Sequence, residues 1–469
     1  MSDKKVDFGM VGLGVMGKNL LLNIAEKGFS GIGLDKDAEK VALFAKETGP
    51  VNLQATASAT EFVDSLKSPK KIMMLVPAGP AVDAVIDDLL PHLEEGDLLM
   101  DGGNSYFADT DRRFQRLSEK GIHYMGVGIS GGEEGARYGP SIMPGGSAEA
   151  YEMIGPVLEA ASAKVNGEPC VTFIGHGSAG NYVKMVHNGI EYAMMQLISE
   201  SYHLMKSGFG LSDDELKEVF NRWNEGELNS FLMEITADIF AKKDPDGSNL
   251  LLNYILDSAR QKGTGKWTSQ HAMDLQVPAP TIDMSVMVRD MSAHKEERVA
   301  AGEVYQNESV KVELESKEAV KKLKNTLCFC FITAFAQGFS MIKAASENYG
   351  YDINLAEVAK IWRGGCIIRA EMLEDFRKIF IKNPSIDNIM VDAGLVKKLS
   401  GYQQDVRECV SIGLKTHVPV PAIMASVAYF DLYKSSWLPV NLVQAQRDYF
   451  GAHTYERTDK EGTFHTVWK

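Results

Sequence analysis

A glycine-rich turn near the N-terminus is the feature that most constrains the fold of this chain. In VDFGMVGLGVMGKNLLLNIAEKG, an apolar strand pattern precedes Gly12 and apolar residues recur at helical spacing after Gly17. The first glycine permits a tight turn, Gly14 lets the backbone approach a pyrophosphate, and Gly17 lets helix and strand pack closely. The sequence therefore predicts a dinucleotide site, with the phosphates at the amino end of a helix over about residues 16–27. The predicted turn consists of Gly12, Leu13, Gly14, Val15, Met16 and Gly17.

Short apolar runs alternate with helical patterns in the first part of the chain. These runs are VDFGMVGLG, SGIGLD, KKIMMLVP, GDLLMDGG and HYMGVGIS. Strands alternating with helices predict βαβ units and a parallel sheet covered by helices on both faces. Beyond about residue 178 the apolar spacing is mostly helical, with long segments at 181–207 and 318–349. We therefore expect an α/β Rossmann-like domain at 1–177, a large all-α domain for substrate binding and dimerisation at 178–436, and a C-terminal tail at 437–469.

Length and composition narrow the class of protein. A chain of 469 residues exceeds the size of one hydrophobic core, so more than one domain is expected. The net charge of −14 argues against nucleic-acid or anionic-membrane partners, which require a basic surface. The N-terminus shows no signal peptide and we expect no membrane span, so we interpret the protein as cytoplasmic. Five scattered cysteines without CxxC spacing predict buried free thiols.

The end of the second predicted strand bears on the choice of dinucleotide. Asp35 is the last residue of SGIGLD and lies about 20 residues after the turn. A carboxylate there would accept hydrogen bonds from the ribose hydroxyls of NAD and repel the 2′-phosphate of NADP. Lys36 could offset that repulsion. On balance the sequence favours NAD and leaves NADP open.

One helical segment gathers an unusual set of polar side chains. In GNYVKMVHNGIEYAMMQ, five polar residues occupy positions i, i+3, i+4, i+7 and i+8, which is one face of a helix. One interpretation is a solvated face with a Lys–Glu pair. The other is a catalytic surface, because a desolvated neutral lysine can take a proton from an alcohol and a carboxylic acid two turns on can deliver one. The five residues are Lys184, His187, Asn188, Glu191 and Tyr192.

Six longer motifs resemble the decarboxylating 6-phosphogluconate dehydrogenases over essentially the whole chain. They are DGGNS (101–105), GISGGEEGARYGPSIMPGG (128–146), KMVHNGIEY (184–192), QKGTGKWT (261–268), IWRGGCIIRA (361–370) and QAQRDYFGAHTYERTDKEGTFHTVW (444–468). The resemblance implies oxidation of 6-phosphogluconate at C3 with hydride transfer to NAD(P), loss of CO2 and release of ribulose 5-phosphate, a reaction of the pentose phosphate pathway. No metal is implied.

The resemblance also implies roles for individual residues. Lys184 would act as general base and then as acid, and Glu191 would protonate C1 of the enediol. The sugar acid or the nicotinamide would be held by Asn104, Ser130, Gly131, Gly132, His187 and Asn188. The phosphate would be held by Tyr192, Lys262, Thr264 and Arg289, and by Arg447 and His453 from the tail of the other subunit of a homodimer. Taken alone, Arg289 would be interpreted as a surface salt bridge and His453 as a packed or capping imidazole. We have no physical account of IWRGGCIIRA beyond close packing at its glycine pair.

Two departures from the family concern the cofactor. The family commonly has Asn-Arg-Thr or a close variant where this chain has Asp35-Lys36-Asp37, and a lysine where this chain has Pro77 in the segment Val76-Pro77-Ala78. Both changes remove features that suit an extra phosphate. Two alternatives to the main function are another β-hydroxyacid dehydrogenase, of the 3-hydroxyisobutyrate type, and a non-catalytic dinucleotide sensor.

Overall fold

The computed structural model describes residues 5–47, 52–305 and 315–469. Within them, the N-terminal part forms one mixed sheet with strand order β10-β7-β6-β5-β4-β1-β2-β3. Its strands are β1 (Phe8–Val11), β2 (Gly31–Leu34), β3 (Leu53–Thr56), β4 (Lys71–Met74), β5 (Leu98–Asp101), β6 (His123–Ser130), β7 (Ser141–Gly146) and β10 (Gly175–His176). A separate small hairpin pairs β8 (Lys164–Val165) with β9 (Glu168–Pro169).

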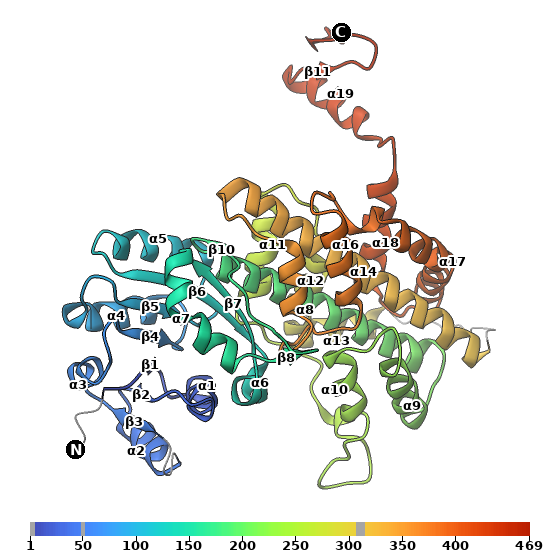
Figure 1. The fold of residues 1–469 in the computed structure, drawn as a ribbon. Coiled ribbons are helices and arrows are strands. Elements are labelled where there is room, and N and C mark those ends of the chain that lie inside the picture. Colours follow the sequence, from blue (N-terminus) through green and yellow to red (C-terminus); the bar gives the residue numbers. More distant parts are fainter. Residues whose placement is uncertain (1–4, 48–51, 306–314) are drawn as a thin grey trace.

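Helices cover both faces of the sheet, as Figure 1 shows. They are α1 (Val15–Glu26), α2 (Ala38–Glu47), α3 (Ala59–Asp64), α4 (Pro80–Leu89), α5 (Phe107–Ser118), α6 (Gly132–Tyr138) and α7 (Ala148–Ala161), with a 3-10 turn η1 at Leu90–His92. Two apolar clusters lie between helices and sheet, and the central strands are buried on both sides. Continuous apolar strands are what a sheet buried on both faces requires.

Strand β7 departs from the predicted parallel sheet. It pairs antiparallel with β6, so that Ser130 lies opposite Ser141. The connection between the two strands holds only the seven-residue helix α6, which is too short for the crossover that parallel strands need. The strand was not predicted because SIMPGG contains proline and glycine and shows no alternation.

The second part of the chain is helical and is built around two long helices. Helix α8 (Ala179–His203) continues into a π-helical turn, η2 (Leu204–Gly208), and packs against α14 (Ser316–Tyr349). The surrounding helices are α9 (Asp213–Asn224), α10 (Phe231–Ile239), α11 (Thr264–Asp274), α12 (Pro280–Ala293), α13 (Lys295–Val304), α15 (Leu355–Ile361), α16 (Met372–Lys382), α17 (Ala393–Lys415) and α18 (Pro421–Lys434), with 3-10 turns η3 (Leu251–Tyr254) and η4 (Ile389–Val391). This architecture confirms the predicted fold class.

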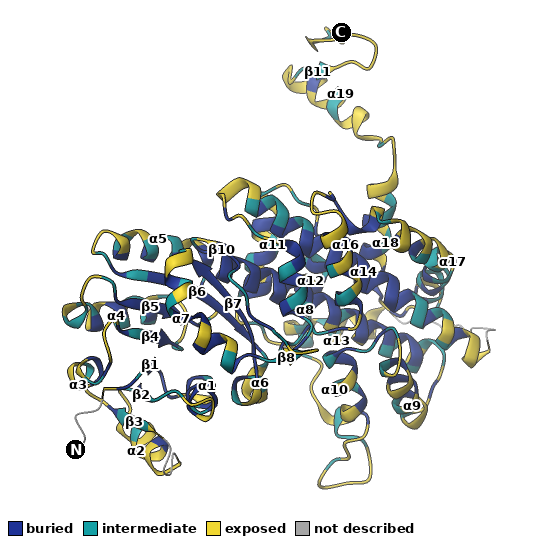
Figure 2. Ribbon diagram, viewed as in Figure 1, coloured by how far each residue is buried: buried dark blue, intermediate teal, exposed yellow. Residues whose placement is uncertain are grey.

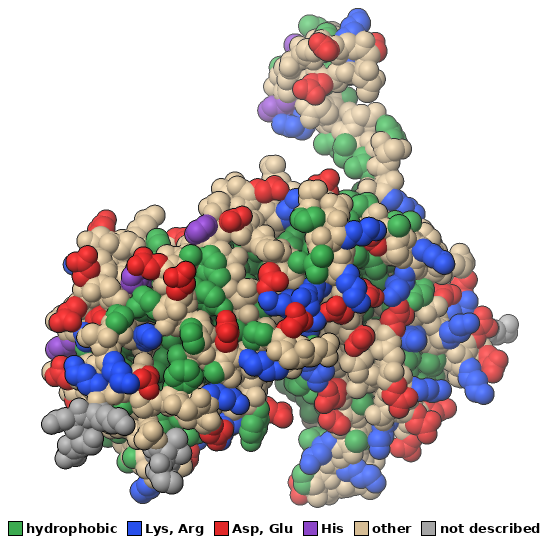
Figure 3. Space-filling model, viewed as in Figure 1, with side chains coloured by type: hydrophobic (Ala, Val, Ile, Leu, Met, Phe, Trp, Pro, Cys, Tyr) green, Lys and Arg blue, Asp and Glu red, His purple; other side chains and the backbone are tan. Residues whose placement is uncertain are grey.

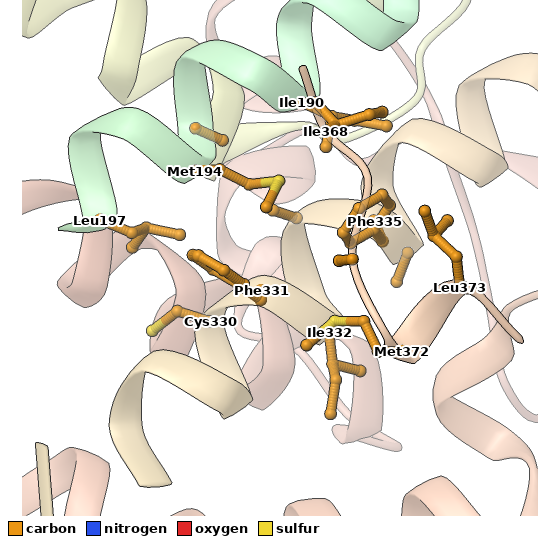
Figure 4. Close-up of a cluster of buried hydrophobic side chains, with 14 of the residues drawn as sticks. Ile190, Met194, Leu197, Cys330, Phe331, Ile332, Phe335, Ile368, Met372 and Leu373 are labelled. Carbon is orange, nitrogen blue, oxygen red and sulfur yellow. The ribbon is translucent and has the colours of Figure 1, made fainter. Parts of the chain in front are cut away.

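The apolar core between α8 and α14 holds the helix of the polar motif in place. Figure 4 shows Ile190, Met194 and Leu197 of α8 directed toward Phe331 and the other side chains of the cluster. Each large side chain that is fully buried contributes about 1.5–3 kcal/mol. Figure 2 shows buried residues along most of both helices. Helix α8 is therefore a rigid base for any chemistry on its opposite side.

Helix α14 is apolar and long enough to cross a membrane by composition alone, but 83% of its most apolar window is buried inside the protein. It is the central helix of the helical core. All five cysteines are buried and free, which confirms that part of the sequence prediction.

The C-terminal tail stands away from the rest of the protomer (Figures 1 and 3). It contains helix α19 (Val440–Gly451) and a small antiparallel hairpin of β11 (Tyr455–Glu456) and β12 (Thr463–Phe464). Its apolar side chains remain largely uncovered, among them Trp437, Leu442 and Phe450 at 62–72% exposure.

Candidate active site

The turn between β1 and α1 has the geometry that its glycines predicted. Gly12 adopts a φ of 94°, and a Cβ there would lie 2.5 Å from the carbonyl oxygen of Leu75. A Cβ on Gly17 would lie 1.9 Å from the carbonyl oxygen of Gly12. A Cβ on Gly14, in contrast, would meet nothing within 4 Å. The turn is thus closed on its protein side and open where a pyrophosphate would approach.

A cavity of about 520 Å³ opens beside this turn. Its walls include the turn, the ends of β2 and β4, and one side of α4 from Ala81 to Leu89. The predicted residues among its lining are Gly12, Gly14, Asp35, Lys36, Val76 and Pro77. A glycine cradle and an adjoining apolar cavity fit a dinucleotide. Leu13 turns its side chain inward against Gly33, so its contribution is its backbone.

Asp35 has a structural task besides any contact with a cofactor. Its Oδ2 accepts a hydrogen bond from Leu13 N at 2.8 Å, and its Oδ1 accepts one from Asp37 N at 3.0 Å. The carboxylate therefore fixes the glycine turn to the end of β2.

The cations at the mouth of the cavity all have carboxylate partners. Lys36 Nζ lies 2.7 Å from Asp88 Oδ2, and Lys40 Nζ lies 3.8 Å from Asp35 Oδ2 and 3.7 Å from Asp37 Oδ2. The sequence analysis missed Lys40, although its place in the first turn of the helix after β2 could have suggested it. Both cations in the described lining, Lys36 and Lys40, are paired with carboxylates, so neither is free to bind a 2′-phosphate.

A buried arginine ties together two loops that flank the cofactor cavity. Arg113 of α5 donates to Asp83 at 2.8 and 3.0 Å and to the carbonyl of Gly79 at 3.0 Å, and lies 3.4 Å from Asp101 Oδ2. Asp101 also accepts hydrogen bonds from Gly103 N and Ser105 Oγ, which shape the loop that presents exposed Asn104. Local sequence gave no signal for this network, since its members are far apart in the chain.

Four of the five residues of the polar stripe on α8 are buried and the Glu191 side chain is 22% exposed, so the interpretation as a solvated face is wrong. Lys184 is 6% exposed and His187 is fully buried. His187 Nε2 lies 3.1 Å from Ser130 Oγ, and His187 Nδ1 lies 3.0 Å from Asn188 Oδ1 and 3.4 Å from Lys184 Nζ. Because the amide oxygen of Asn188 can only accept, Nδ1 carries the proton and Nε2 accepts from the Ser130 hydroxyl. Glu191 Oε2 lies 3.8 Å from the same imidazole.

Burial shifts the pKa values of these groups toward their neutral forms. Desolvation lowers the pKa of the Lys184 amine, although the Glu191 carboxylate opposes that shift. Desolvation raises the pKa of Glu191, against the opposing charges of Lys184 and Arg289. Desolvation and the nearby Lys184 place the pKa of His187 well below its usual value, so the imidazole is neutral. The two shifts favour the neutral amine of Lys184 and the protonated carboxyl of Glu191 relative to the same groups in water.

The loop Ser130–Gly132 lies against α8 and is backed by the IWRGGCIIRA motif. Gly131 and Gly132 adopt φ values of 125° and 63°, which favour glycine. A Cβ on Gly131 would lie 2.6 Å from the carbonyl oxygen of Gly365, and that same oxygen accepts a hydrogen bond from Ser141 N at 2.7 Å. The Trp362 ring packs edge-to-face on His187 with centroids 5.8 Å apart. The motif thus packs against both the loop and the imidazole of His187.

A group of three residues around one guanidinium, Tyr192, Thr264 and Arg289, adjoins the far end of the stripe and is called the cationic cluster. The Arg289 guanidinium stacks on the Tyr192 ring at 3.4 Å from its centroid, a cation–π contact. A Cβ on Gly265, in the first turn of α11, would lie 2.5 Å from the same ring. Thr264 is the first residue of α11 and Lys262 precedes it by two residues. The structure therefore brings Tyr192, Thr264 and Arg289 together at a helix N-terminus, where an anion is favoured.

Arg447 and His453 do not join this cluster within one chain. In the described residues, Arg447 donates to Gln444 and His453 packs edge-to-face on Phe450, both inside the tail. The tail projects away from the body, as Figure 1 shows.

A Rossmann-like domain with an open glycine cradle, joined to a helix that carries a buried amine beside an imidazole and a carboxyl, indicates a dinucleotide-dependent dehydrogenase. Comparison with known proteins narrows that class. Residues 7–175 match the NAD binding domain of 6-phosphogluconate dehydrogenase, and residues 180–468 match the 6-phosphogluconate dehydrogenase C-terminal domain. The chain belongs to the decarboxylating 6-phosphogluconate dehydrogenase family.

Individual relatives match over nearly full length. The chain is 53% identical to the NADP(+)-dependent, decarboxylating 6-phosphogluconate dehydrogenase of Bacillus subtilis and 48% identical to the decarboxylating enzyme of Escherichia coli, with 99% of each chain covered in both cases. A 6-phosphogluconate dehydrogenase from Plasmodium falciparum, solved in its apo form and with NADP+ and 6-phosphogluconate, superposes with a TM-score of 0.96 at 44% identity, covering 98% of this chain and 100% of that one. The predicted family is therefore confirmed.

Proposed function

We propose that this chain oxidises 6-phosphogluconate at C3 and decarboxylates it to ribulose 5-phosphate. The observation that carries the proposal is the buried stripe of α8, which places a desolvated amine and a desolvated carboxyl between the Ser130–Gly132 loop and the cationic cluster. A bound nicotinamide would accept a hydride from C3. The test is dinucleotide reduction coupled to stoichiometric CO2 release from 6-phosphogluconate, with 3-hydroxyisobutyrate as the comparison substrate. Turnover of the comparison substrate alone would contradict the proposal.

Lys184 is the proposed proton acceptor for the 3-hydroxyl. Its lowered pKa makes the neutral amine accessible, so it can take the hydroxyl proton as hydride leaves C3. The resulting ammonium then gives a proton to the C3 carbonyl oxygen as the bond between C1 and C2 breaks and CO2 departs. Neutral His187 would add no competing charge beside that ammonium.

Glu191 is the proposed acid for the last step. Loss of CO2 leaves an enediol, whose terminal carbon, C1 of the product, must gain a proton to give the ketose. A carboxyl whose pKa is raised by burial carries that proton. Glu191 lies one turn along α8 from His187, on the side of Tyr192.

The substrate ends are assigned to two different groups of residues. The carboxylate and hydroxyls would be held by Asn104, the loop Ser130–Gly132 and Asn188. The phosphate would be held by Tyr192, Lys262, Thr264 and Arg289, where α11 begins. An arginine fork and a helix N-terminus are matched to a phosphate dianion. A local cation cluster of this kind is required in a chain whose net charge is −14.

The tail of a second subunit would complete the phosphate site. Arg447 and His453 lie in a segment that projects from its own protomer and leaves Trp437, Leu442 and Phe450 exposed. A second copy of the chain is the proposed cover for these apolar side chains. Truncation after Pro439 should raise the KM for 6-phosphogluconate steeply, and an unchanged KM would contradict the shared site.

We propose NAD as the preferred cofactor of this chain. Asp35 lies at the cavity where a ribose would bind, and each neighbouring lysine is paired with a carboxylate. The Bacillus subtilis relative is named as NADP(+)-dependent, so the proposal predicts a difference between the two enzymes. The test is kcat/KM for NAD and for NADP at fixed 6-phosphogluconate. A strong preference for NADP would overturn it.

A further inference from the structure

One carboxylate in the tail is buried although the helix around it is exposed. Asp448 is the only residue of α19 that is buried, at 0% exposure. Its Oδ1 accepts from Thr454 N at 3.0 Å and pairs with His465 Nδ1 at 2.8 Å. Its Oδ2 accepts from Thr466 N at 3.0 Å and from Trp468 Nε1 at 2.9 Å. Both oxygens are thus fully used by donors within the tail.

The four donors come from separate stretches of the chain. Thr454 lies in the turn after α19, whereas His465, Thr466 and Trp468 follow β12 at the C-terminal end. Asp448 therefore fastens the terminal hairpin to the helix. Desolvation acts to raise the pKa of this carboxyl, but the hydrogen bonds together lower it to about 2, so it remains an anion throughout the working pH range. The tail has no apolar core, so these polar contacts determine its shape.

The hydrogen bonds to Asp448 also hold the backbone around His453 in place. Ala452 and Thr454 adopt φ values of 49° and 60°, a left-handed conformation that costs a non-glycine residue about 1–2 kcal/mol. The Thr454 N–H is itself one of the donors to Asp448. The two tail residues assigned to the phosphate therefore adjoin this carboxylate: Arg447 precedes Asp448 in α19, and His453 precedes Thr454, whose N–H donates to Asp448.

We propose that Asp448 is a positioning residue, which sets Arg447 and His453 in the arrangement that binds the substrate phosphate before the tail docks on the partner subunit. The inference rests on the proposed function of the tail. Asp448 itself has no part in contacting substrate, because both its oxygens are occupied.

The test compares a phosphorylated and an unphosphorylated substrate in the full-length enzyme. Asp448→Asn leaves one oxygen for four donors and turns an amide N–H2 toward two of them. We expect kcat/KM for 6-phosphogluconate to fall at least about tenfold, the equivalent of one charge-assisted hydrogen bond. We expect kcat/KM for D-gluconate, which lacks the phosphate, to remain unchanged. An equal fall for both substrates, or no fall for either, would overturn the positioning role.

A matched control lies on the same tail. Asp459 is exposed and pairs only with Arg457 in the described structure, so Asp459→Asn should change neither value. Arg447→Ala separates the inference from its premise. If Arg447→Ala leaves the ratio of the two kcat/KM values unchanged, the phosphate site in the tail fails and the inference fails with it. If Arg447→Ala lowers the ratio and Asp448→Asn does not, the phosphate site stands and only the positioning role is wrong.

A milder variant covers the case in which Asp448→Asn does not fold or assemble. Trp468→Phe removes one of the four donors and keeps an aromatic ring beside Tyr449, whose ring centroid lies 6.1 Å from that of Trp468. A smaller fall in the same ratio is expected, with an unchanged sedimentation profile. A ratio equal to that of the unmodified enzyme would overturn the proposal.

Discussion

Replacement of Lys184 by alanine should abolish most turnover while leaving the fold in place. The residue is 6% exposed on a helix whose other faces are buried. Its Cβ packs against Gly128, where an added Cβ would come within 2.4 Å. Since Lys184→Ala keeps that Cβ, the contact between α8 and β6 survives. The substitution removes the amine beside His187, and with it the proposed base.

The size of the effect follows from the role of a general base. Such a group typically contributes about 10²–10⁴ in rate, which corresponds to about 3–5 kcal/mol in the activation free energy. The assay is steady-state reduction of the dinucleotide at saturating substrate, with the KM for 6-phosphogluconate expected to change much less than kcat. Small primary amines should restore part of the rate, because they fit the space that the side chain leaves. Lys206→Ala, beyond the end of α8 where the amine pairs with Asp213, is the matched control and should retain full activity.

The base role would be refuted by a Lys184→Ala enzyme that keeps kcat within about tenfold of the unmodified protein. Failure of every amine to restore activity, in a variant that still binds 6-phosphogluconate, would point instead to a purely electrostatic task. The pH profile gives an independent check. Neutral Lys184 is the proposed active form, so activity should rise as pH rises through its lowered pKa, and in the amine-rescued variant the rise should follow the pKa of the added amine instead.

Three further substitutions test other parts of the site. Glu191→Gln should lower kcat about 10²–10⁴-fold and remove the fall in activity at high pH, because the protonated carboxyl is the active form and its pKa is raised; a retained high-pH limb in the kcat/KM profile would contradict this. Gly17→Ala should raise the KM for the dinucleotide at least about tenfold, since its Cβ would meet the Gly12 carbonyl at 1.9 Å; unchanged dinucleotide binding by fluorescence titration would argue against the close packing. Gly365→Ala, at a φ of 67° with Gly139 O only 2.5 Å from the new Cβ, should lower stability by about 1–3 kcal/mol. Gly401→Ala has nothing within 4 Å of its Cβ and should not lower the melting temperature.

Local sequence pattern was sufficient to predict the glycine turn and the polar face of α8. The glycines at 12, 14 and 17 act on their nearest neighbours, so their spacing carries most of the geometry. Polar residues at i, i+3 and i+4 must share a helical face whatever packs against it. Pattern could not decide whether that face meets solvent. Lys184 and His187 are buried because β6, β7 and the 361–370 motif cover them. His187 contacts Ser130, 57 residues earlier in the chain, and Trp362, 175 residues later.

Contacts between distant segments explain what the sequence did not reveal. Arg113 reaches Asp83 and Asp101 from a third element, and nothing in a run of charged residues distinguishes an arginine that will be fully buried. Strand β7 was missed because its burial comes from neighbours on both sides rather than from its own alternation. Lys40 needed the position of α2 relative to β2 before its distance from Asp35 could be known.

The 361–370 motif gains a physical explanation from its place behind the active site. Its glycine at 365 touches the loop at Gly131 through a carbonyl oxygen, and the same oxygen accepts a hydrogen bond from β7. Trp362 limits the movement of His187, whose other polar contacts are Ser130, Lys184, Asn188 and Glu191. A proton transfer requires donor and acceptor to be held within hydrogen-bond reach, and neither the loop nor the imidazole could be held from α8 alone. The motif therefore restricts the movement of the loop and the imidazole in front of it.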